Sequence, residues 1–336
     1  MKPGFFHQSL RAQDATHGVQ PKAGPRLRVV FAVTEVGADA AAGDVFTAME
    51  LGAALAQQFG WQVSYRPQGT GWYALSDVDV VVAMVDDFDP RCIAGGSGTL
   101  IKVAWARNWF ERWCNRDGFG QFDVYLASSL LGASYLGSRL GKLVRVLRIA
   151  TNTQRFTAED RAQNLPFDYV FTGSYWDADR DIVQALSGIP PALRGAVYGK
   201  NWHQVPALGA LNQGFVRYQD LPGVYRQTAV VIDDANHVTK AWGAANSRVF
   251  DALAAGCLVI TNSESVSHEV FAGELPVYRS PAELGQLLSG FLQNPTATAQ
   301  LQQRLRVQVV QQHNYTLRAH EFRSHIARFQ GTRGGT

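Results

Sequence analysis

The chain has 336 residues and a mass of 36.8 kDa, which suits two domains of roughly 150 residues each. Hydrophobic residues make up 46% and charged residues 18%, a composition typical of a folded chain and unlike that of a disordered one. The formal net charge of +3 is too small to indicate a nucleic-acid-binding protein. We therefore expect two folded domains and no nucleic-acid partner.

Neither the apolar runs nor the cysteines indicate a membrane-spanning or secreted protein. The longest apolar runs reach about six residues, far fewer than the ~20 of a transmembrane helix. Cys92, Cys114 and Cys257 have neither disulfide nor zinc-ligand spacing. Residues 1–25 lack the apolar segment of a signal peptide and show no periodicity. The sequence predicts a cytoplasmic protein with a flexible arm at residues 1–25.

Strand and helix patterns alternate through the first half of the chain. Residues 28–33 are a short apolar, β-branched run of the kind used by buried parallel strands. After a loop, a helix begins at Gly43-Asp44 and continues to residue 59. Further strands are expected at 62–65, 78–85, 122–127 and 142–149, with helices at 103–113 and 129–140. This alternation predicts a doubly wound, Rossmann-like sheet.

Trp105, Trp109 and Trp113 are spaced by four, which would place their rings on one face of the expected helix. Such a stripe is more often core than a platform for a ligand. The surrounding residues 102–116 also carry arginines, a combination found in helices at membrane surfaces. Core packing and peripheral membrane contact are both open for this segment.

The alternation breaks at residues 150–156 and then starts again. Strands are expected at 168–172, 196–198, 228–233, 257–261 and 275–278, and helices at 178–186, 247–255, 267–271 and 282–292. Residues 297–329 are helical by periodicity, with a break at Asn314-Tyr315. The chain is therefore expected to be an α/β protein with two Rossmann-like halves.

The usual nucleotide-binding motifs are missing. Neither Val33 nor Thr172 is followed by G-x-G-x-x-G, and no Walker A motif occurs, which disfavours NAD-type redox chemistry and P-loop phosphoryl transfer. The most informative window is residues 233–262, where a strand edge leads through a polar loop into an alanine-rich helix. The backbone N–H groups at the start of such a helix would bind a pyrophosphate.

Charged residues accompany this helix start. Arg248 and Lys240 would supply charge-assisted hydrogen bonds to phosphate, and Asp251 lies three residues beyond Arg248. A carboxylate at that position could accept hydrogen bonds from both hydroxyls of a ribose. The alternative is an ordinary surface Arg–Asp pair.

Residues 246–260 (NSRVFDALAAGCLVI) resemble the donor-binding segment of GT-B glycosyltransferases, in particular the glycosyl transferases group 1 and CgeB-like families, with the pattern N-x-R-x-F-E-A-x-A-x-G-x-x-x-I. Residues 149–156 are similar to the linker between the two GT-B domains, and residues 168–176 to the first strand and turn of the donor domain. Residues 313–319 (HNYTLRA) resemble a C-terminal H-x-Y-x-x-R-A signature. Residues 43–52 and 105–109 also look like bacterial members of this group.

The resemblance implies the GT-B fold, in which two Rossmann-like domains face each other across a cleft and a C-terminal helix crosses back to the first domain. Residues 26–155 would form an acceptor-binding domain and residues 156–314 a nucleotide-sugar-binding domain. Residues 315–330 would form the returning helix.

The resemblance also implies a glycosyltransferase that moves a hexosyl or deoxyhexosyl group from a nucleotide diphosphate sugar to a glycan, lipid-linked or protein acceptor. The setting would be bacterial polysaccharide or glycoconjugate biosynthesis, in the cytoplasm or at the inner face of the membrane. No cofactor and no metal are expected, because GT-B enzymes neutralise the leaving diphosphate with side-chain cations and helix dipoles.

Candidate site residues follow from the same resemblance. The donor would be bound by six residues: Gly173, Arg180, Lys240, Asn246, Arg248 and Asp251. An inverting enzyme would need a general base, for which Asp44 is the first candidate and Asp87 the second. Asp44 is alternatively a plain helix cap. In a retaining enzyme no base is required, and Arg107 and Asn108 would orient acceptor or donor.

One departure from the family pattern matters. Retaining relatives carry E-x7-E, whereas here the second acidic position is Asp251 and the first is Gly243. Retention and inversion therefore both stay open, and a second hypothesis is a non-catalytic GT-B scaffold that binds a glycan or a partner enzyme. A third, an epimerase, would need acidic and histidine side chains converging on the sugar, which the sequence does not show.

Overall fold

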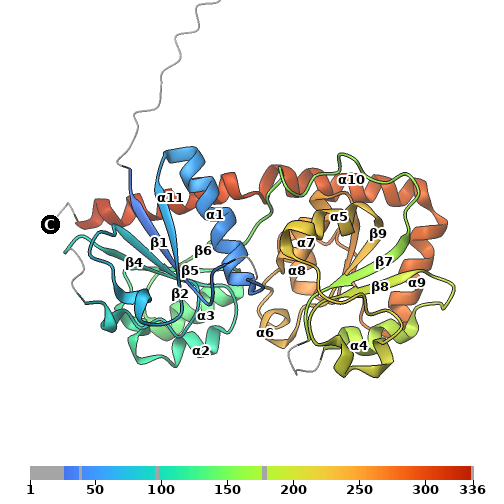
Figure 1. The fold of residues 1–336 in the computed structure, drawn as a ribbon, viewed down its shortest axis with the longest axis horizontal. Coiled ribbons are helices and arrows are strands. Elements are labelled where there is room, and N and C mark those ends of the chain that lie inside the picture. Colours follow the sequence, from blue (N-terminus) through green and yellow to red (C-terminus); the bar gives the residue numbers. More distant parts are fainter. Residues whose placement is uncertain (1–25, 38–39, 95–97, 176–179, 334–336) are drawn as a thin grey trace, which may run out of the picture.

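The computed structural model describes residues 26–37, 40–94, 98–175 and 180–333. They form two parallel β-sheets that lie side by side, each with helices packed against it (Figure 1). The arm expected at residues 1–25 lies outside the described residues.

The first sheet has six parallel strands in the order β2-β1-β3-β4-β5-β6. They are β1 (Arg28–Val33), β2 (Gln62–Pro67), β3 (Val80–Ala83), β4 (Ile101–Ala106), β5 (Val124–Ala127) and β6 (Val144–Val146). Because β2 lies on one side of β1 and β3 on the other, the winding reverses between β1 and β3. Open sheets bind ligands beyond the carboxyl ends of the strands at such a switch point.

Three α-helices accompany this sheet: α1 (Gly43–Phe59), α2 (Phe110–Cys114) and α3 (Leu130–Leu140), with 3₁₀ turns at Thr70–Tyr73, Pro90–Cys92 and Asp117–Gln121. Helix α1 buries Leu51 and Leu55 against the sheet. It ends at Gly60, whose φ of 66° lets its N–H bond the carbonyl of Ala56.

The helix predicted over residues 103–113 is wrong. Residues up to Ala106 form strand β4, and only Phe110–Cys114 is helical. Trp105 is a fully buried strand residue whose Nε1 donates to the Leu147 carbonyl at 2.9 Å. A strand buried on both faces shows no alternation, so the spacing of the tryptophans imitated a helix. The tryptophan–arginine helix that supported membrane contact therefore does not form.

The second sheet has four parallel strands in the order β10-β9-β7-β8. They are β7 (Phe167–Thr172), β8 (Gly195–Tyr198), β9 (Thr228–Asp233) and β10 (Leu258–Thr261). The winding reverses between β7 and β9, so the second switch point lies beside Thr172 and Asp233. The helices are α4 (Asp181–Ala185), α5 (Leu221–Arg226), α6 (His237–Lys240), α7 (Ser247–Ala254), α8 (Glu264–Phe271) and α9 (Pro281–Gln293), with 3₁₀ turns at Leu186–Gly188, Trp202–Gln204, Pro206–Leu208 and Tyr218–Asp220.

Two long C-terminal helices join the halves. Helix α10 (Pro295–Gln312) packs on the core of the second sheet, and α11 (Tyr315–Arg333) then runs back over the first (Figure 1). Ala319, Phe322 and Ile326 of α11 belong to the core of the first sheet. The expected helix that crosses back to the first domain is thus confirmed.

A loop between α6 and α7 makes a second connection, which we call the Trp242 contact. The Trp242 ring lies 5.4 Å from that of Phe110 and 4.7 Å from that of Tyr135, both in the first half. Ala244 is 1% exposed and belongs to a core cluster of the first half. The two halves therefore pack directly on each other as well as through the linker and α11.

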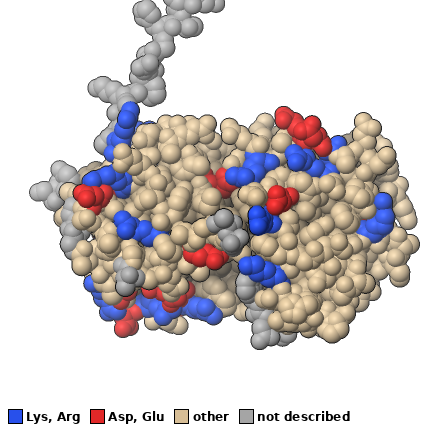
Figure 2. All heavy atoms as spheres, viewed as in Figure 1, with Lys and Arg blue, Asp and Glu red and all other residues tan. Residues whose placement is uncertain are grey.

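Charged residues of both signs are scattered over the face seen in Figure 2, among mostly uncharged ones. Many are paired, as Arg116 is with Asp86 and Asp87. Among the helices of the described residues, none is long and apolar enough to cross a membrane.

Candidate functional site

A cavity of about 220 Å³ lies between the two halves and is lined by residues from both. The first half contributes α1 and the loop before it. The second contributes the carboxyl ends of β7 and β8, the start of α7, and residues 215–225. The lining residues are Ala41, Gly43, Phe46, Thr47, Thr172, Gly173, Ser174, Tyr198, Gly199, Phe215, Val216, Tyr218, Leu221, Tyr225, Ser247, Arg248, Asp251 and Tyr315.

Arg248 spans the switch point of the second sheet. Its Nε donates to the Thr172 carbonyl at the end of β7, and its Nη1 lies 2.6 Å from Asp233 Oδ1 at the end of β9. The guanidinium also lies over the Phe171 ring, 4.7 Å from its centroid. Among the described residues, Nη2 has no recorded hydrogen-bond partner. Arg248 is thus rigidly held and keeps one nitrogen for a ligand in the cavity that it lines.

Gly173 gives this guanidinium its space. A Cβ at position 173 would lie 2.6 Å from Arg248 Nη2. The Gly173 carbonyl accepts a hydrogen bond from Trp202 Nε1 at 2.6 Å, which fixes the peptide. A side chain at this position would displace Arg248 or narrow the cavity.

Asp251 is a buried carboxylate in the cavity wall. Its side chain is 2% exposed, and its Oδ1 accepts a hydrogen bond of 2.6 Å from the Thr151 hydroxyl. Burial raises the pKa of Asp251 well above its ordinary value, while the hydrogen bond from Thr151 opposes that rise. In the described part of the chain, no hydrogen bond to Oδ2 is recorded. This oxygen is available to accept from a hydroxyl in the cavity.

Aromatic residues close the cavity across the boundary between the halves. Phe46 of α1 stacks on Tyr218 of the second half, with ring centroids 4.4 Å apart and planes at 13°. The Arg155 guanidinium lies 5.4 Å from the Tyr218 ring. The apolar wall and the polar groups opposite it suit a ligand with both ring and hydroxyl surfaces.

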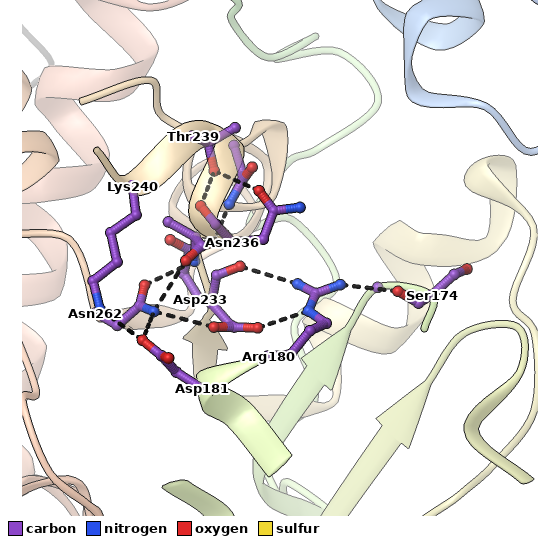
Figure 3. Close-up of polar contacts among 12 residues, drawn as sticks. Ser174, Arg180, Asp181, Asp233, Asn236, Thr239, Lys240 and Asn262 are labelled. Carbon is purple, nitrogen blue, oxygen red and sulfur yellow. Dashed lines mark hydrogen bonds and ion pairs between the residues drawn. The ribbon is translucent and has the colours of Figure 1, made fainter. Parts of the chain in front are cut away.

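Arg180 and Lys240 lie outside this lining, in a network around the end of β9 (Figure 3). Asn246 also lies outside the lining. Arg180 Nε bonds Asp234 Oδ2 at 2.7 Å, and Lys240 Nζ bonds Asp181 Oδ2 at 2.6 Å. Asn246 donates to Asp233 at 3.0 Å. Burial raises the pKa of Asp234, and the charge of Arg180 opposes that rise.

The charges of this network balance. Arg180, Lys240 and Arg248 are each paired with one of three aspartates: Asp234, Asp181 and Asp233. The sequence predicts these cations as free phosphate ligands but gives no partner for them. Of the three, Arg248 alone lines the cavity between the halves, while Lys240 lines a separate cavity of about 550 Å³ beside α8 and α9.

The acceptor-side candidates lie beyond the cavity wall. Asp44 is buried, and its Oδ2 accepts from the Thr34 backbone N–H at 2.7 Å; the N-cap of α1 is Ala42. Asp44 thus holds the loop after β1 and does not cap its own helix. Arg107 donates to the Met84 carbonyl at 3.3 Å, and its Nε is buried without a recorded partner among the described residues. Burial lowers the pKa of Arg107, and the Asp44 charge opposes this.

Asn108 follows Arg107 and is partly exposed. Asp87 lies farther along the surface, where it is 48% exposed and pairs with Arg116. The structure therefore brings Asp44 and Arg107 together near the cavity but holds Asp87 in a surface ion pair.

Sequence reasoning missed four polar residues that hold the site. Thr151 binds Asp251, and buried Glu50 of α1 accepts from Asn152 and Arg155 of the linker. In the sequence, the linker shows as the break in the strand–helix alternation at residues 150–156, and this was the signal available. Which carboxylates its residues meet depends on contacts 100 or more positions apart, which no local pattern contains.

Groups of three or more His, Cys, Asp or Glu residues that could hold a metal ion do not occur among the described residues.

Residues 172–324 match a protein family described as glycosyl transferase-like. No curated protein matches the chain in sequence. Among solved structures, HepE of Anabaena in complex with UDP and glucose has a TM-score of 0.66 and 11% identity, and covers 90% of this chain and 100% of its own. Sucrose-phosphate synthase of Thermosynechococcus elongatus gives 0.63 and 14%, covering 91% and 100%. AviGT4, a glycosyltransferase of avilamycin A biosynthesis, gives 0.61 and 16%, covering 92% and 99%.

These likenesses show the fold over nearly the whole chain. The expected GT-B architecture is confirmed, and so is the resemblance to glycosyl transferases in the second half. The CgeB-like assignment is not confirmed.

Proposed function

We propose that this protein is a glycosyltransferase whose nucleoside diphosphate sugar donor binds in the cavity between the halves, because residues 172–324 match a glycosyl transferase-like family and the chain has the GT-B fold. One observation carries the proposal: the cavity opens at the switch point of the second sheet and is lined by Gly173, Arg248 and Asp251. HepE, which shares the fold, has been solved with UDP and glucose.

The donor would lie along the second half. The ribose hydroxyls would donate to Asp251 Oδ2, and the diphosphate would accept from Arg248 Nη2 and from backbone N–H groups at the start of α7. Arg180 and Asn246 would act indirectly, by holding Asp234 and Asp233 at the end of β9, and Lys240 by pairing with Asp181 of α4. The transferred hexosyl or deoxyhexosyl group would then point toward the first half.

The acceptor would approach from the first half. If the reaction inverts, Asp44 is the proposed base; if it retains, Arg107 and Asn108 orient the reactants. We further propose residues 26–155 and 156–314 as the acceptor and donor domains, residues 315–330 as the returning helix, and a cytoplasmic glycan, lipid-linked or protein acceptor in bacterial glycoconjugate biosynthesis. No metal or cofactor is part of this proposal.

Nucleotide binding tests the proposal directly. Thermal-shift and calorimetric titrations with UDP, GDP, ADP and dTDP should give one or more stabilising ligands; a ligand at 100 times its Kd raises the unfolding free energy by about 2.7 kcal/mol. Arg248→Ala should lose at least tenfold in affinity, since it removes a charge-assisted contact.

The matched control is Arg194→Ala, because Arg194 forms an exposed ion pair with Asp168 away from the cavity. This control should bind as the wild type does. Arg248→Lys retains a charge beside Asp233 and shows whether any loss in the alanine variant comes from unfolding. Binding of none of the four nucleotides by the wild type would refute the proposal.

A second candidate function is a non-catalytic scaffold, because Gly243 occupies the position of the first acidic residue of the E-x7-E pattern. A Cβ at position 243 would lie 3.3 Å from Glu269 Oε2, so the loop that would carry the missing acidic residue is packed close to α8. Donor turnover in the presence of an acceptor excludes the scaffold. Nucleotide binding without turnover over a wide range of glycan acceptors favours it.

A further inference from the structure

The linker between the halves holds one buried carboxylate from each of them. Thr151 Oγ1 donates to Asp251 Oδ1 of α7 at 2.6 Å. The next residue, Asn152, donates through Nδ2 to Glu50 Oε2 of α1 at 2.5 Å. Because successive side chains of an extended segment point to opposite sides, neighbouring linker residues reach opposite halves. The position of the linker therefore sets the geometry of both carboxylates.

Thr151 itself is held by the junction between α10 and α11. Its N–H donates to the His313 carbonyl at 3.0 Å, and its carbonyl accepts from the Tyr315 N–H at 3.1 Å. The residue is 0% exposed. Its backbone and hydroxyl are thus all bonded, and the hydroxyl cannot turn toward water. Any movement of the halves about the linker moves the hydrogen bond to Asp251.

Asp251 has few other partners to orient it. The groups that face it are Glu50 of α1, Arg155 of the linker, Arg248 of its own helix, and the hydroxyls of Tyr218, Tyr225 and Tyr315. Arg248 is already bonded to Asp233, and Arg155 to Glu50. The Thr151 hydroxyl is the hydrogen-bond donor recorded for Asp251 within the described residues. It fixes Oδ1 and leaves Oδ2 toward the cavity.

We propose that Thr151 is a positioning residue: its hydroxyl orients the Asp251 carboxylate for the ribose of the donor, and thereby couples donor binding to the relative position of the two halves. The inference rests on the proposed function, because it takes Asp251 as the ribose-binding carboxylate. It adds a residue that lies outside the cavity lining and acts through Asp251.

The test compares Thr151→Val, which has nearly the shape of threonine but no hydroxyl, with Thr151→Ser, which restores the hydroxyl. Thr153→Val is the matched control, since no hydrogen bond of the Thr153 side chain is recorded in the described structure. UDP, GDP and ADP, each with its 2′-deoxy counterpart, are titrated calorimetrically into the full-length protein. Thermal melts confirm that every variant is folded, and Thr151→Ala serves as a second hydroxyl-free variant.

Thr151→Val should weaken binding of the preferred ribonucleotide about tenfold, as expected for loss of a hydrogen bond to a charged group. The 2′-deoxy counterpart should bind the wild type more weakly but should be affected little by the substitution, because it makes less use of Asp251. The preference for ribose should therefore shrink in Thr151→Val and return in Thr151→Ser. A merely structural role would weaken both nucleotides equally.

Affinity as a function of pH gives a second readout. Asp251 must be ionised to accept two hydroxyls, so affinity should rise as the pH rises through its pKa. The Thr151 hydrogen bond lowers that pKa, so the midpoint should move to higher pH in Thr151→Val and back in Thr151→Ser.

The outcomes separate the two proposals. If the wild type binds none of the nucleotides, the proposed function and this inference both fail. If the wild type binds and prefers ribose, but folded Thr151→Val keeps the same preference and pH midpoint, the inference alone is overturned.

Discussion

At the scale of single residues, the three-residue spacing of Arg248 and Asp251 did not predict the side chains that each of them contacts. The two lie three positions apart on one helix, which suggested either a ligand pair or a surface ion pair. In the structure Arg248 turns to Asp233 and Asp251 turns to Thr151. The surface Arg–Asp pair is therefore not formed, and each side chain serves a different part of the cavity wall.

Asp251→Asn should stabilise the protein while removing nucleotide binding. Burial raises the pKa of Asp251 in the folded state. The folded protein therefore binds a proton at Asp251 more tightly than the unfolded chain does. This contribution to stability is fully present below the unfolded pKa and is lost as the pH rises through the folded one. Asparagine has no charge to bury, so the Tm of Asp251→Asn should exceed that of the wild type at neutral pH. This difference in Tm should shrink as the pH falls toward about 4.

The control for this experiment is Asp168→Asn, where Arg194 holds the carboxyl's pKa below its usual range. That substitution should not raise Tm at neutral pH. Thermal melts over a pH series and calorimetry with the preferred nucleotide measure both effects. An Asp251→Asn variant that binds nucleotide like the wild type contradicts the ribose-binding role.

At the scale of elements, the expected strands and helices correspond to those observed except over residues 103–113 and at the strand expected at 275–278, where Val277 forms only an isolated bridge with Thr261. Residues 228–233 were expected as a strand and form β9 with the same bounds, and the break expected at Asn314-Tyr315 separates α10 from α11. The failure over residues 103–113 has a physical cause, because β4 lies inside the sheet with both neighbours paired. The motif at residues 246–260 located the ligand-binding end of the second sheet. It did not predict the ion pairs there, in which Arg180 meets Asp234 and Arg248 meets Asp233.

Removing the Trp242 contact should change the overall dimensions of the molecule measurably. Trp242→Ala should remove the apolar contact with Phe110 and Tyr135 and let the halves separate more often. We expect a larger radius of gyration by small-angle X-ray scattering and a loss of about 2 kcal/mol in stability, less than for a fully buried tryptophan. Trp72→Ala is the control, because Trp72 is buried wholly within the first half. It should destabilise the fold without the same expansion, and equal scattering curves for wild type and folded Trp242→Ala would refute the prediction.

At the scale of the whole molecule, the junction of α10, α11 and the linker makes the unfolding free energy depend on pH. His313 lies at this junction, packed 5.1 Å from the Phe250 ring, with Nδ1 at 2.9 Å from Arg318 Nη2. Its Nε2 is buried and has no recorded partner among the described residues. Burial, together with the charges of Arg318 and Arg148, lowers the pKa of His313 to about 4. The folded state thus holds His313 neutral at a pH where the unfolded chain would protonate it.

The unfolding free energy should therefore fall as the pH drops from about 6.5 toward about 4, by up to about 3 kcal/mol from His313. A histidine whose pKa is lower in the folded state stabilises the fold fully at pH values above its unfolded pKa. This stabilisation is lost as the pH falls toward the folded pKa. His313→Gln should flatten this dependence, as measured by denaturant unfolding at a series of pH values. His320→Gln, at an exposed position on α11, should leave the slope unchanged. Equal slopes in wild type and His313→Gln would contradict the assignment.

The amino-acid sequence by itself determined the fold class, the two Rossmann-like halves and the glycosyl transferase-like segment. These depend on local apolar patterns and on a motif whose residues are close in the chain. The tertiary structure alone decided which side chains meet in the cavity, which cations are already neutralised, and that Thr151 holds Asp251. Some of these contacts join residues 100 or more positions apart. Their partners are set by the packing of two sheets and a returning helix, so no local pattern could contain them.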